Sequence, residues 1–560
     1  MSAPIRIRHT FIVHDQWHQT FRDAADSLEL TSDKLVLRDV PGARQDRAVV
    51  SLDRVAEKDL FHDLESLRIE ISSKENYAHV SPFDRPIPWG THISIAPRNS
   101  SGYDWNSLCR FLERISPETE CNGISSFIEM PYGFYLHSPS VSLTSFINYL
   151  TVTYSPMNFS DLSSAHYISI SFTASDSDYA DARTNGRVLA EAYWYYGRWF
   201  KTIPSPPKGI KVEVGILNKI SDDAEGDMTF GGILAVIGEN AQFVPTLFDF
   251  APRHRPTIAL PQPVYKPDFR VPYGLHPKHL TVVEGALQVP RISVRTVTID
   301  GRERDLALTG LETSSVTCGL YAYYTLPRFI FVDQYQISDL ADAQAGGVKR
   351  VVGIWGETDL EIPVWMVDKW GSTMLLELIP PPVVEAIEDD SDERSANRAK
   401  HLPKTYPIQR LDVEIPMHSR YEVPDWNISA VVHDIPWPSI FWACNSSSEM
   451  EMRKGPFDSN MLGPERLFER GTSFYYILAN QSLTTPVSSS ALTTKLSIPV
   501  VKLEAYDYVQ PWTVGVILAG CVWIVYKTFL NYFRDGGIRK QPGNPRKPSP
   551  RSSAEEKKNN

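Results

Sequence analysis

The chain has 560 residues, more than a single hydrophobic core supports, so two or three domains are expected. Apolar residues make up 42% and aromatic residues 11%, as in globular proteins, and Pro (42) outnumbers Gly (31), which favours short strands and extended links. A formal net charge of −11 at pH 7 removes the electrostatic basis for binding nucleic acid or an anionic lipid surface.

The first twenty residues contain no apolar run of seven, so we expect no secretory signal peptide at this end. Further along, apolar and polar side chains alternate strictly in several stretches, the pattern of half-buried strands. These stretches are Ile93–Ile95, Ile168–Phe172, Ile210–Ile216, Leu411–Ile415 and Leu496–Val500. The best helix candidates are residues 54–73 and 180–200. The pattern predicts a mainly β protein of sandwich-like domains with a few helices, followed by a single C-terminal transmembrane helix.

The proline-rich stretch 252–277 indicates a domain boundary. We therefore expect a β-rich N-terminal region over residues 1–280 and a second β domain over 315–505. The acidic run at 385–394 is typical of a solvated loop and is interpreted as an insertion in the second domain. A transmembrane helix at 508–533 and a basic tail at 534–560 complete the predicted organisation.

Residues 508–526 contain no charged side chain. Nineteen residues at a rise of ~1.5 Å span about 28 Å, the thickness of a thin endoplasmic reticulum bilayer. Tyr and Trp gather at both ends of the segment, as they do at membrane interfaces. After Phe533, eight Lys or Arg stand against three acidic residues. The positive-inside rule then predicts a cytosolic tail and a lumenal location for residues 1 to about 507.

Lys557 and Lys558 occupy the fourth and third positions from the carboxyl end. This pair resembles the dilysine retrieval signal that coat proteins read from the cytosol on endoplasmic reticulum membrane proteins. The signal and the charge asymmetry agree on one orientation. The sequence thus predicts a single-pass protein of the endoplasmic reticulum membrane, with coat proteins as partners of its tail.

Four of the five cysteines precede the span, and Cys521 lies within it. An even lumenal count allows two disulfides in three possible connectivities, and four buried free thiols are the alternative. Pairing Cys109 with Cys121 would close a short local loop and leave Cys318 with Cys444 as a long-range pair. The cysteine spacing matches no zinc pattern.

Five Asn-x-Ser sequons occur, and all of them precede the span, as lumenal exposure requires. The predicted glycosylation sites are Asn99, Asn158, Asn427, Asn445 and Asn480.

Residues suited to catalysis are sparse in this chain. Two Asp-x-Asp triplets, 176–178 and 390–392, could chelate a divalent ion for a sugar nucleotide, but both lie in polar Ser/Asp-rich stretches. His418 and His433, near Cys444, could act as ligands or as a base, although isolated strand histidines are more often structural. Metalloprotease, dinucleotide, P-loop and serine hydrolase motifs are absent from the sequence. We expect no catalytic residue, metal or cofactor.

Two regions near the C-terminus carry a family resemblance. Residues 413–424 (VEIPMHSRYEVP) contain Pro416, His418, Arg420 and Tyr421 in a Pro-x-His-x-Arg-Tyr pattern, followed by a proline-rich stretch that ends at Cys444. Upstream, a Leu-Pro-x4-Val-Asp-x-Tyr element contains Leu326, Pro327, Asp333 and Tyr335, and residues 360–363 (LEIP) follow it. Together with the span, these elements resemble the PIG-X family over roughly residues 315–530. The N-terminal half is similar in place and length to the extension of its fungal branch, the protease B non-derepressible homologues.

The resemblance implies a non-catalytic, stabilising subunit of glycosylphosphatidylinositol (GPI) mannosyltransferase I. Its implied partner is a multispanning catalytic subunit of the PIG-M type, which transfers the first mannose from dolichol-phosphate-mannose in the lumen. The resemblance implies no cofactor and no nucleic acid partner.

The Pro416, His418, Arg420 and Tyr421 motif allows two roles. The side chains could face the catalytic partner, since Arg and aromatic residues often anchor interfaces. Alternatively they could close a corner of the sandwich, with Arg420 pairing a buried acid and Tyr421 packing inside. The structural role is slightly preferred.

Two other functions compete with the subunit hypothesis. A lumenal glycosyltransferase would use the Asp-x-Asp pairs and be active alone. A general folding factor or chaperone would bind many glycoprotein clients through its acidic β surface.

Overall fold

The structure is a computed structural model. It describes residues 5–13, 26, 28–73, 82–83, 87–139, 143–153, 160–175, 186–206, 209–222, 228–237, 243–250, 252–257, 259–270, 272–290, 296–299, 302–305, 317–387, 405–445, 457, 461–480 and 492–535. By contacts, residues 1–423 and 430–500 group into one compact unit, and residues 424–429 group with those from 501 onward into a second.

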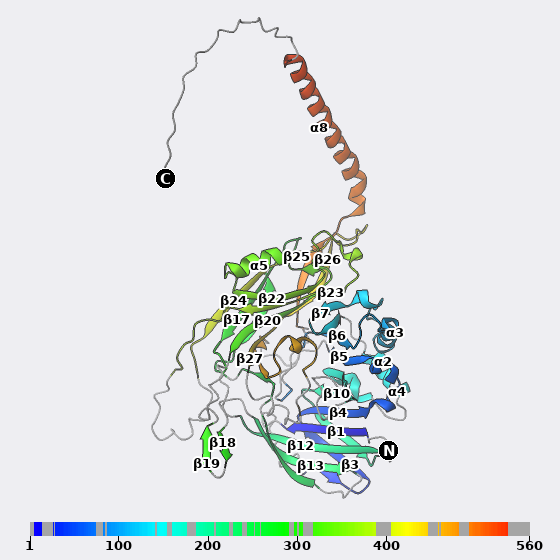
Figure 1. Ribbon diagram of the computed structural model, residues 1–560, viewed down its shortest axis with the longest axis vertical. Helices are drawn as coiled ribbons and strands as arrows, with labels where there is room; N and C mark the ends of the chain where they lie inside the picture. The colour runs from blue at the N-terminus through cyan, green and yellow to red at the C-terminus, as the bar shows by residue number, and fades with distance from the viewer. Residues whose placement is uncertain are drawn as a thin grey trace, which may run out of the picture. The chain divides into compact units, whose positions relative to one another are not determined.

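Within the described residues, the N-terminal half is built on an eleven-stranded sheet (Figure 1). Its spatial order is β14-β13-β12-β1-β4-β10-β9-β5-β6-β8-β7, with β1 parallel to β12 and the other neighbours antiparallel. The strands are β1 (Ile5–Val13), β4 (Ala43–Ser51), β5 (Leu64–Ser72), β6 (Gly90–Pro97), β7 (Ile128–Met130), β8 (Gly133–Ser138), β9 (Tyr167–Thr173), β10 (Arg187–Trp194), β12 (Ile210–Asp222), β13 (Met228–Ile237) and β14 (Phe243–Phe250).

Helices cover one face of this sheet around β5. In α3 (Trp105–Ile115) the buried residues Leu108, Phe111, Leu112 and Ile115 recur at helical spacing, and Asp104 caps the helix by accepting from the Ser107 amide. They pack in one core with Leu67, Ile69 and Ile71 of β5. The other short helices of this half are η2 (Leu52–Arg54), α2 (Lys58–His62), η3 (Ile124–Ser126), α4 (Leu143–Thr153) and η4 (Ser160–Ser164).

A second core of the N-terminal half lies between the large sheet and a small one. The small sheet has the order β11-β3-β2, and its apolar residues, such as Leu35 and Ile203, pack with Val212, Val214 and Ile216 of β12. Its strands are β2 (Leu28–Leu30), β3 (Lys34–Pro41) and β11 (Arg198–Pro204).

The C-terminal part is a β-sandwich. Among the described residues a six-stranded sheet, β15-β28-β27-β20-β23-β22, faces a four-stranded sheet, β24-β17-β16-β29. One core fills the space between them, and it takes Leu320, Tyr324 and Leu376 from the first sheet and Val283 and Val413 from the second. The strands are β15 (His254–Pro256), β16 (Val264–Phe269), β17 (Lys278–Gly285), β20 (Cys318–Pro327), β22 (Val348–Gly356), β23 (Gly371–Leu378), β24 (Gln409–Pro416), β27 (Ser439–Asn445), β28 (Thr472–Tyr476) and β29 (Leu478–Ala479).

Short pairs of strands and helices complete the sandwich. The pairs are β18 (Thr296–Ile299) with β19 (Arg302–Asp305), β21 (Ile330–Phe331) with β25 (His418–Ser419), and β26 (Ala430–Pro436) with β30 (Thr493–Pro499). The helices are α5 (Gln334–Asp342), η6 (Val364–Met366) and η8 (Gly463–Leu467).

The second face of the six-stranded sheet packs against the N-terminal sheet through a buried polar layer. Arg68 Nε lies 2.6 Å from Glu70 Oε1 on β5, and Arg68 Nη1 lies 3.8 Å from Glu465 Oε1 on η8. His254 Nε2 of β15 lies 3.5 Å from the same Glu465 oxygen. Burial raises the pKa of Glu70, whereas for Glu465 the burial is outweighed by His254 and Arg68, which lower its pKa.

The second unit contains α8 (Tyr506–Asp535), preceded by η9 (Leu503–Ala505). Of the helices in the described ranges, this is the one long and apolar enough to cross a membrane. The predicted fold class, mainly β with one C-terminal membrane-length helix, is confirmed. The boundaries predicted for the domains stay predictions, and the basic tail lies outside the described residues.

The five alternating stretches all lie in strands, namely β6, β9, β12, β24 and β30. Both helix predictions were wrong. Residues 54–73 contain only the short α2 before β5, and the described part of 180–200 forms β10 and the start of β11. β5 and β10 are central strands, each paired on both sides, and this pairing outweighs the local helix preference of their Leu, Ala and Glu residues.

Two disulfides are present, Cys109–Cys121 and Cys318–Cys444. The second joins directly opposed residues of β20 and β27.

Peptide mapping without reduction should recover both linked pairs. Because the stabilisation grows with the size of the closed loop, replacing Cys318 and Cys444 by Ala should lower the free energy of unfolding by ~5 kcal/mol, against ~3 kcal/mol for the local pair. Cys521→Ser is the control and should change neither.

His279 of β17 gives stability a pH dependence. Its ring is buried 5.1 Å from Phe269 and 5.6 Å from Tyr324, and burial lowers its pKa to about 4. Unfolded histidine titrates near ~6.5, so between these values only the unfolded state takes up the proton. Stability from this group should be complete above pH ~6.5 and decline by ~1.4 kcal/mol per unit as pH falls toward 4. The free energy of unfolding of His279→Gln can be measured in urea at several pH values between 4 and 6.5. Its dependence on pH should be shallower than that of the wild-type chain by about one proton, and an unchanged dependence would contradict the assignment.

Candidate functional site

The two motif regions meet at one corner of the C-terminal sandwich. β21 pairs with β25, with Ile330 opposite Ser419 and Phe331 opposite His418. The pairing continues beyond the strands, since the Arg420 amide donates to the Phe329 carbonyl at 2.9 Å. Segments about 90 residues apart in sequence therefore form one local structure, which we call the motif corner.

Arg420 is the buried centre of the motif corner, with only 3% of its surface exposed. Its guanidinium donates to the carbonyl oxygens of Asp359, Ile362 (2.8 Å) and Glu357 (3.2 Å), and lies 4.2 Å from the centre of the Phe331 ring. Burial lowers the pKa of Arg420, but an arginine stays protonated in proteins. The side chain thus holds the loop 357–362 against the corner. The buried acid predicted as its partner was wrong, because backbone carbonyls take that place.

Tyr421 points away from the interior, with 58% of its surface exposed, so the prediction that it packs inside was wrong. The extended backbone alternates here. Glu422 turns inward and lies 2.7 Å from His433, which stacks on Phe329, and Val423 turns outward again. The Tyr421 carbonyl accepts a hydrogen bond from the Val364 amide at 3.1 Å, which ties η6 to this strand.

His418 lies at the edge of the motif corner. Its Nδ1 is 3.1 Å from Nδ1 of His276, and its Nε2 is 3.3 Å from Oε1 of Gln336. Burial and the neighbouring His276 lower the pKa of His418, while Asp333 opposes the shift. Within the described residues no group of three or more His, Cys, Asp or Glu is arranged to hold a metal. One of the two facing Nδ1 atoms donates and the other accepts, so His418 and His276 form a hydrogen-bonded contact.

The other motif residues support the corner. Leu326 is buried in the sandwich core, and Pro327 ends β20 opposite Gly371. Gly371 has a positive φ of 154°, and a Cβ there would lie 2.1 Å from the Leu326 carbonyl, so only glycine allows this approach. Asp333 caps α5 by accepting from the Tyr335 amide at 2.8 Å, whereas the Tyr335 side chain is exposed. Pro416 ends β24 opposite Lys278.

Sequence reasoning missed the loop residues that the corner presents. Trp365 and Met366 of η6 are 53% and 64% exposed, and Leu360 is 51% exposed. The LEIP element at 360–363 was the available signal, because it contains Leu360 and ends two residues before Trp365.

Of the predicted glycosylation sites, Asn99, Asn427 and Asn480 are exposed, and Asn445 is half-buried with its amide donating to Glu469. Asn158, Lys557 and Lys558 lie outside the described residues, as do both Asp-x-Asp triplets. Glycosylation and the retrieval signal stay predictions.

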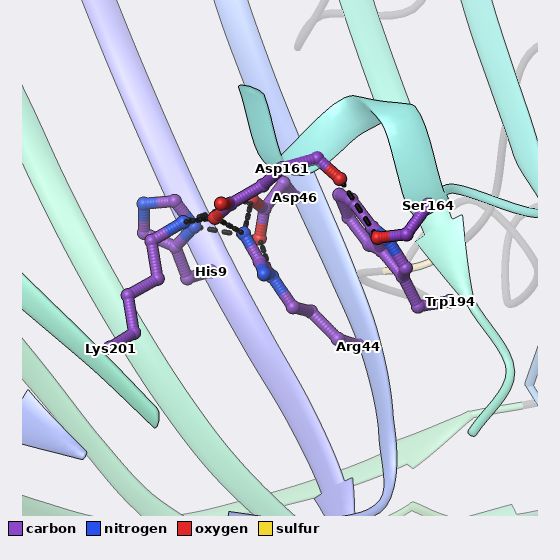
Figure 2. A network of polar contacts seen from close by, with 7 residues as sticks. All are labelled: His9, Arg44, Asp46, Asp161, Ser164, Trp194 and Lys201. Atoms are coloured by element: carbon purple, nitrogen blue, oxygen red, sulfur yellow. Dashed lines mark hydrogen bonds and ion pairs between the residues drawn. The ribbon is translucent and has the colours of Figure 1, made fainter. Parts of the chain in front are cut away.

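A second polar cluster, in the N-terminal half, joins five elements (Figure 2). Asp46 of β4 lies 2.7 Å from His9 Nδ1 and also pairs with Arg44, whose guanidinium sits 4.3 Å from the Trp194 ring. Lys201 and Arg44 both reach Asp161 on η4. Ser164 accepts from the Trp194 indole at 3.1 Å and donates to the Asp161 carbonyl. Each group is engaged with a structural partner, so we interpret the cluster as holding β1, β4, β10, β11 and η4 together.

A cavity of about 80 Å³ lies in the polar layer and is lined by Glu70, His92, Tyr323, Glu465 and Phe474, among others. Cavities that bind organic ligands usually measure ~300–1,000 Å³. This one has room for a few water molecules.

A family model described as PIG-X / PBN1 matches residues 272–529. Protein pbn1 of Emericella nidulans is 29% identical over 565 aligned residues, which cover 94% of this chain and 96% of that protein. Protein pbn1 of Aspergillus oryzae is 29% identical, with 90% and 93% covered, and that of Neurospora crassa is 27% identical, with 92% and 95% covered. The N-terminal half is thus shared with these relatives. Because the family model includes the motif corner and most of α8, and the relatives align over nearly the whole chain, this protein belongs to the PIG-X/PBN1 family.

Proposed function

We propose that this protein is the non-catalytic, stabilising subunit of GPI mannosyltransferase I, paired with a multispanning catalytic subunit of the PIG-M type. Family membership connects the chain to GPI-anchor biosynthesis at the level of the family. The proposal of a specific subunit role rests on what residues 272–529, the region matched by the family model, contain. It holds a β-sandwich and a membrane-length helix, and its motif residues build a presented surface around a buried arginine.

The proposal includes a location. The chain is a single-pass protein of the endoplasmic reticulum membrane, with residues 1 to about 507 in the lumen and a cytosolic tail. The apolar α8 and the basic residues after Phe533 support this orientation.

A mild-detergent pull-down of the tagged full-length chain tests both parts. The eluate should contain one multispanning partner and transfer mannose to glucosaminyl-phosphatidylinositol. A mixture of many clients at low stoichiometry would instead favour a general folding factor.

Orientation is tested on the same preparation. Endoglycosidase H should increase the mobility of the chain, and Asn99→Gln and Asn480→Gln should each remove one step of that shift, because both side chains are exposed. Insensitivity of the wild-type chain to the enzyme would place the bulk of it in the cytosol and remove the basis of the proposal.

Arg420→Ala separates the two roles of the motif. Because the substitution leaves three carbonyls without their charged donor, the free energy of unfolding should fall by about 2–4 kcal/mol. Arg410→Ala is the control. Arg410 is an exposed arginine of β24 paired with Glu284 and Asp412, and its loss should cost less than ~1 kcal/mol. Loss of the partner with unchanged stability of the Arg420 variant would instead assign Arg420 to the interface.

A further inference from the structure

Five exposed apolar side chains lie on two hydrogen-bonded segments at the motif corner. Leu360 comes from the loop that Arg420 holds, Trp365 and Met366 come from η6 directly after it, and Tyr421 and Val423 come from the segment hydrogen-bonded to η6. Each is between 51% and 64% exposed. We call this surface the apolar rim. Large side chains gathered in this way usually mark a contact with another molecule.

The apolar rim is held rigidly. Arg420 fixes the loop at three carbonyls, the Met366 amide closes η6 on the Pro363 carbonyl at 3.0 Å, and Val367 is buried behind it. The Asp359 side chain accepts from the Glu361 amide at 2.9 Å and stiffens the loop further. A surface ordered before binding loses little conformational entropy when it docks. Such rigidity benefits recognition of a protein of defined shape more than insertion into a fluid lipid.

Charge around the apolar rim also favours a protein partner. Asp359, Glu361 and Asp368 are exposed beside the apolar side chains. Carboxylates pressed toward hydrocarbon carry a large desolvation cost, which opposes seating the rim in a bilayer. An apolar centre with a charged border is the usual arrangement of a protein interface, and Trp and Tyr are its commonest energetic anchors.

Chain connectivity restricts where such a partner can be. Val423 is followed directly by Pro424, and the next residue, Asp425, donates its amide to the Val501 carbonyl at 3.2 Å. Its carbonyl accepts from the Leu503 amide at 3.0 Å, three residues before α8 begins at Tyr506. The peptide bond between Val423 and Pro424 therefore joins the rim directly to the compact unit that contains the apolar helix. We expect a partner of the rim to be a membrane protein for this reason.

We propose that the apolar rim is the docking surface for a membrane-embedded protein, which it contacts through an apolar, membrane-proximal loop that lacks acidic flanks. This inference rests on the proposed function and names that protein as the multispanning mannosyltransferase subunit. Arg420 acts in it as a positioning residue, since it holds the loop that carries Trp365 and does not touch the partner.

Trp365→Ser combined with Met366→Ser in the full-length chain tests the surface. An epitope-tagged multispanning subunit, co-expressed with it, is the probe. Truncating two interface anchors should lower the amount of this subunit recovered per chain at least about tenfold. The thermal midpoint of the variant itself should stay unchanged, because both side chains are exposed. Phe200→Ser, on β11 and 71% exposed, is the matched control and should leave recovery unchanged.

A photoreactive phenylalanine derivative in place of Tyr421 identifies the occupant. A crosslink to the tagged subunit, absent when the derivative replaces Phe200, would support the proposal. A crosslink to phospholipid, or to a second copy of this chain, would overturn it. Undiminished recovery of the subunit with the Trp365 and Met366 variant would also overturn it while leaving the proposed function intact. If the wild-type chain recovers neither the subunit nor mannose transfer, the proposed function itself fails.

Discussion

The fold of the large unit depends on a set of charges buried between two sheets. Arg68 and Glu70 come from β5 of the N-terminal sheet, whereas Glu465 and His254 come from the C-terminal part of the chain. Glu465 is buried and is approached by Arg68 from one sheet and by His254 from the other, and a buried charge that loses its partner costs several kcal/mol. The constraint explains why residues up to 423 and from 430 to 500 form a single compact unit. The N-terminal half is in this sense part of the scaffold on which the sandwich rests.

The same layer decides which surface remains available for recognition. The six-stranded sheet is covered on one face by the four-stranded sheet and on the other by the N-terminal half, where Tyr323, Phe441 and Phe474 line the contact. Both faces of the six-stranded sheet are therefore unavailable to a partner. The motif corner is built by β21, β25 and the loop 357–362, outside that sheet. Its loop is fixed by backbone bonds to a single arginine, so the apolar rim needs no further sheet to support it.

Sequence patterns predicted the strands whose two faces differ in polarity, such as Ile210–Ile216, because period-two alternation is visible without knowledge of partners. They failed for β5. Its alternation of Ile69 and Ile71 with Arg68 and Glu70 is also regular, but the stretch was predicted to be a helix, whereas it is a central strand with both faces buried. The family resemblance located His418 and Arg420 correctly in one motif. It could not give the partners of Arg420, since these are backbone carbonyls whose residue identity carries no signal.

Adjacent motif residues divide two tasks. Arg420 points inward, and its planar, five-donor guanidinium can satisfy three carbonyls at once, which the single ammonium of a lysine cannot do with the same geometry. Tyr421 points outward, and its carbonyl accepts from the amide of Val364, the residue before Trp365. Extended backbone makes this opposition obligatory, because successive side chains leave a strand on opposite sides. A short motif can therefore fix a loop and present an aromatic contact within two residues. In the proposed interaction, the buried arginine therefore fixes the position of the exposed apolar side chains that contact the partner.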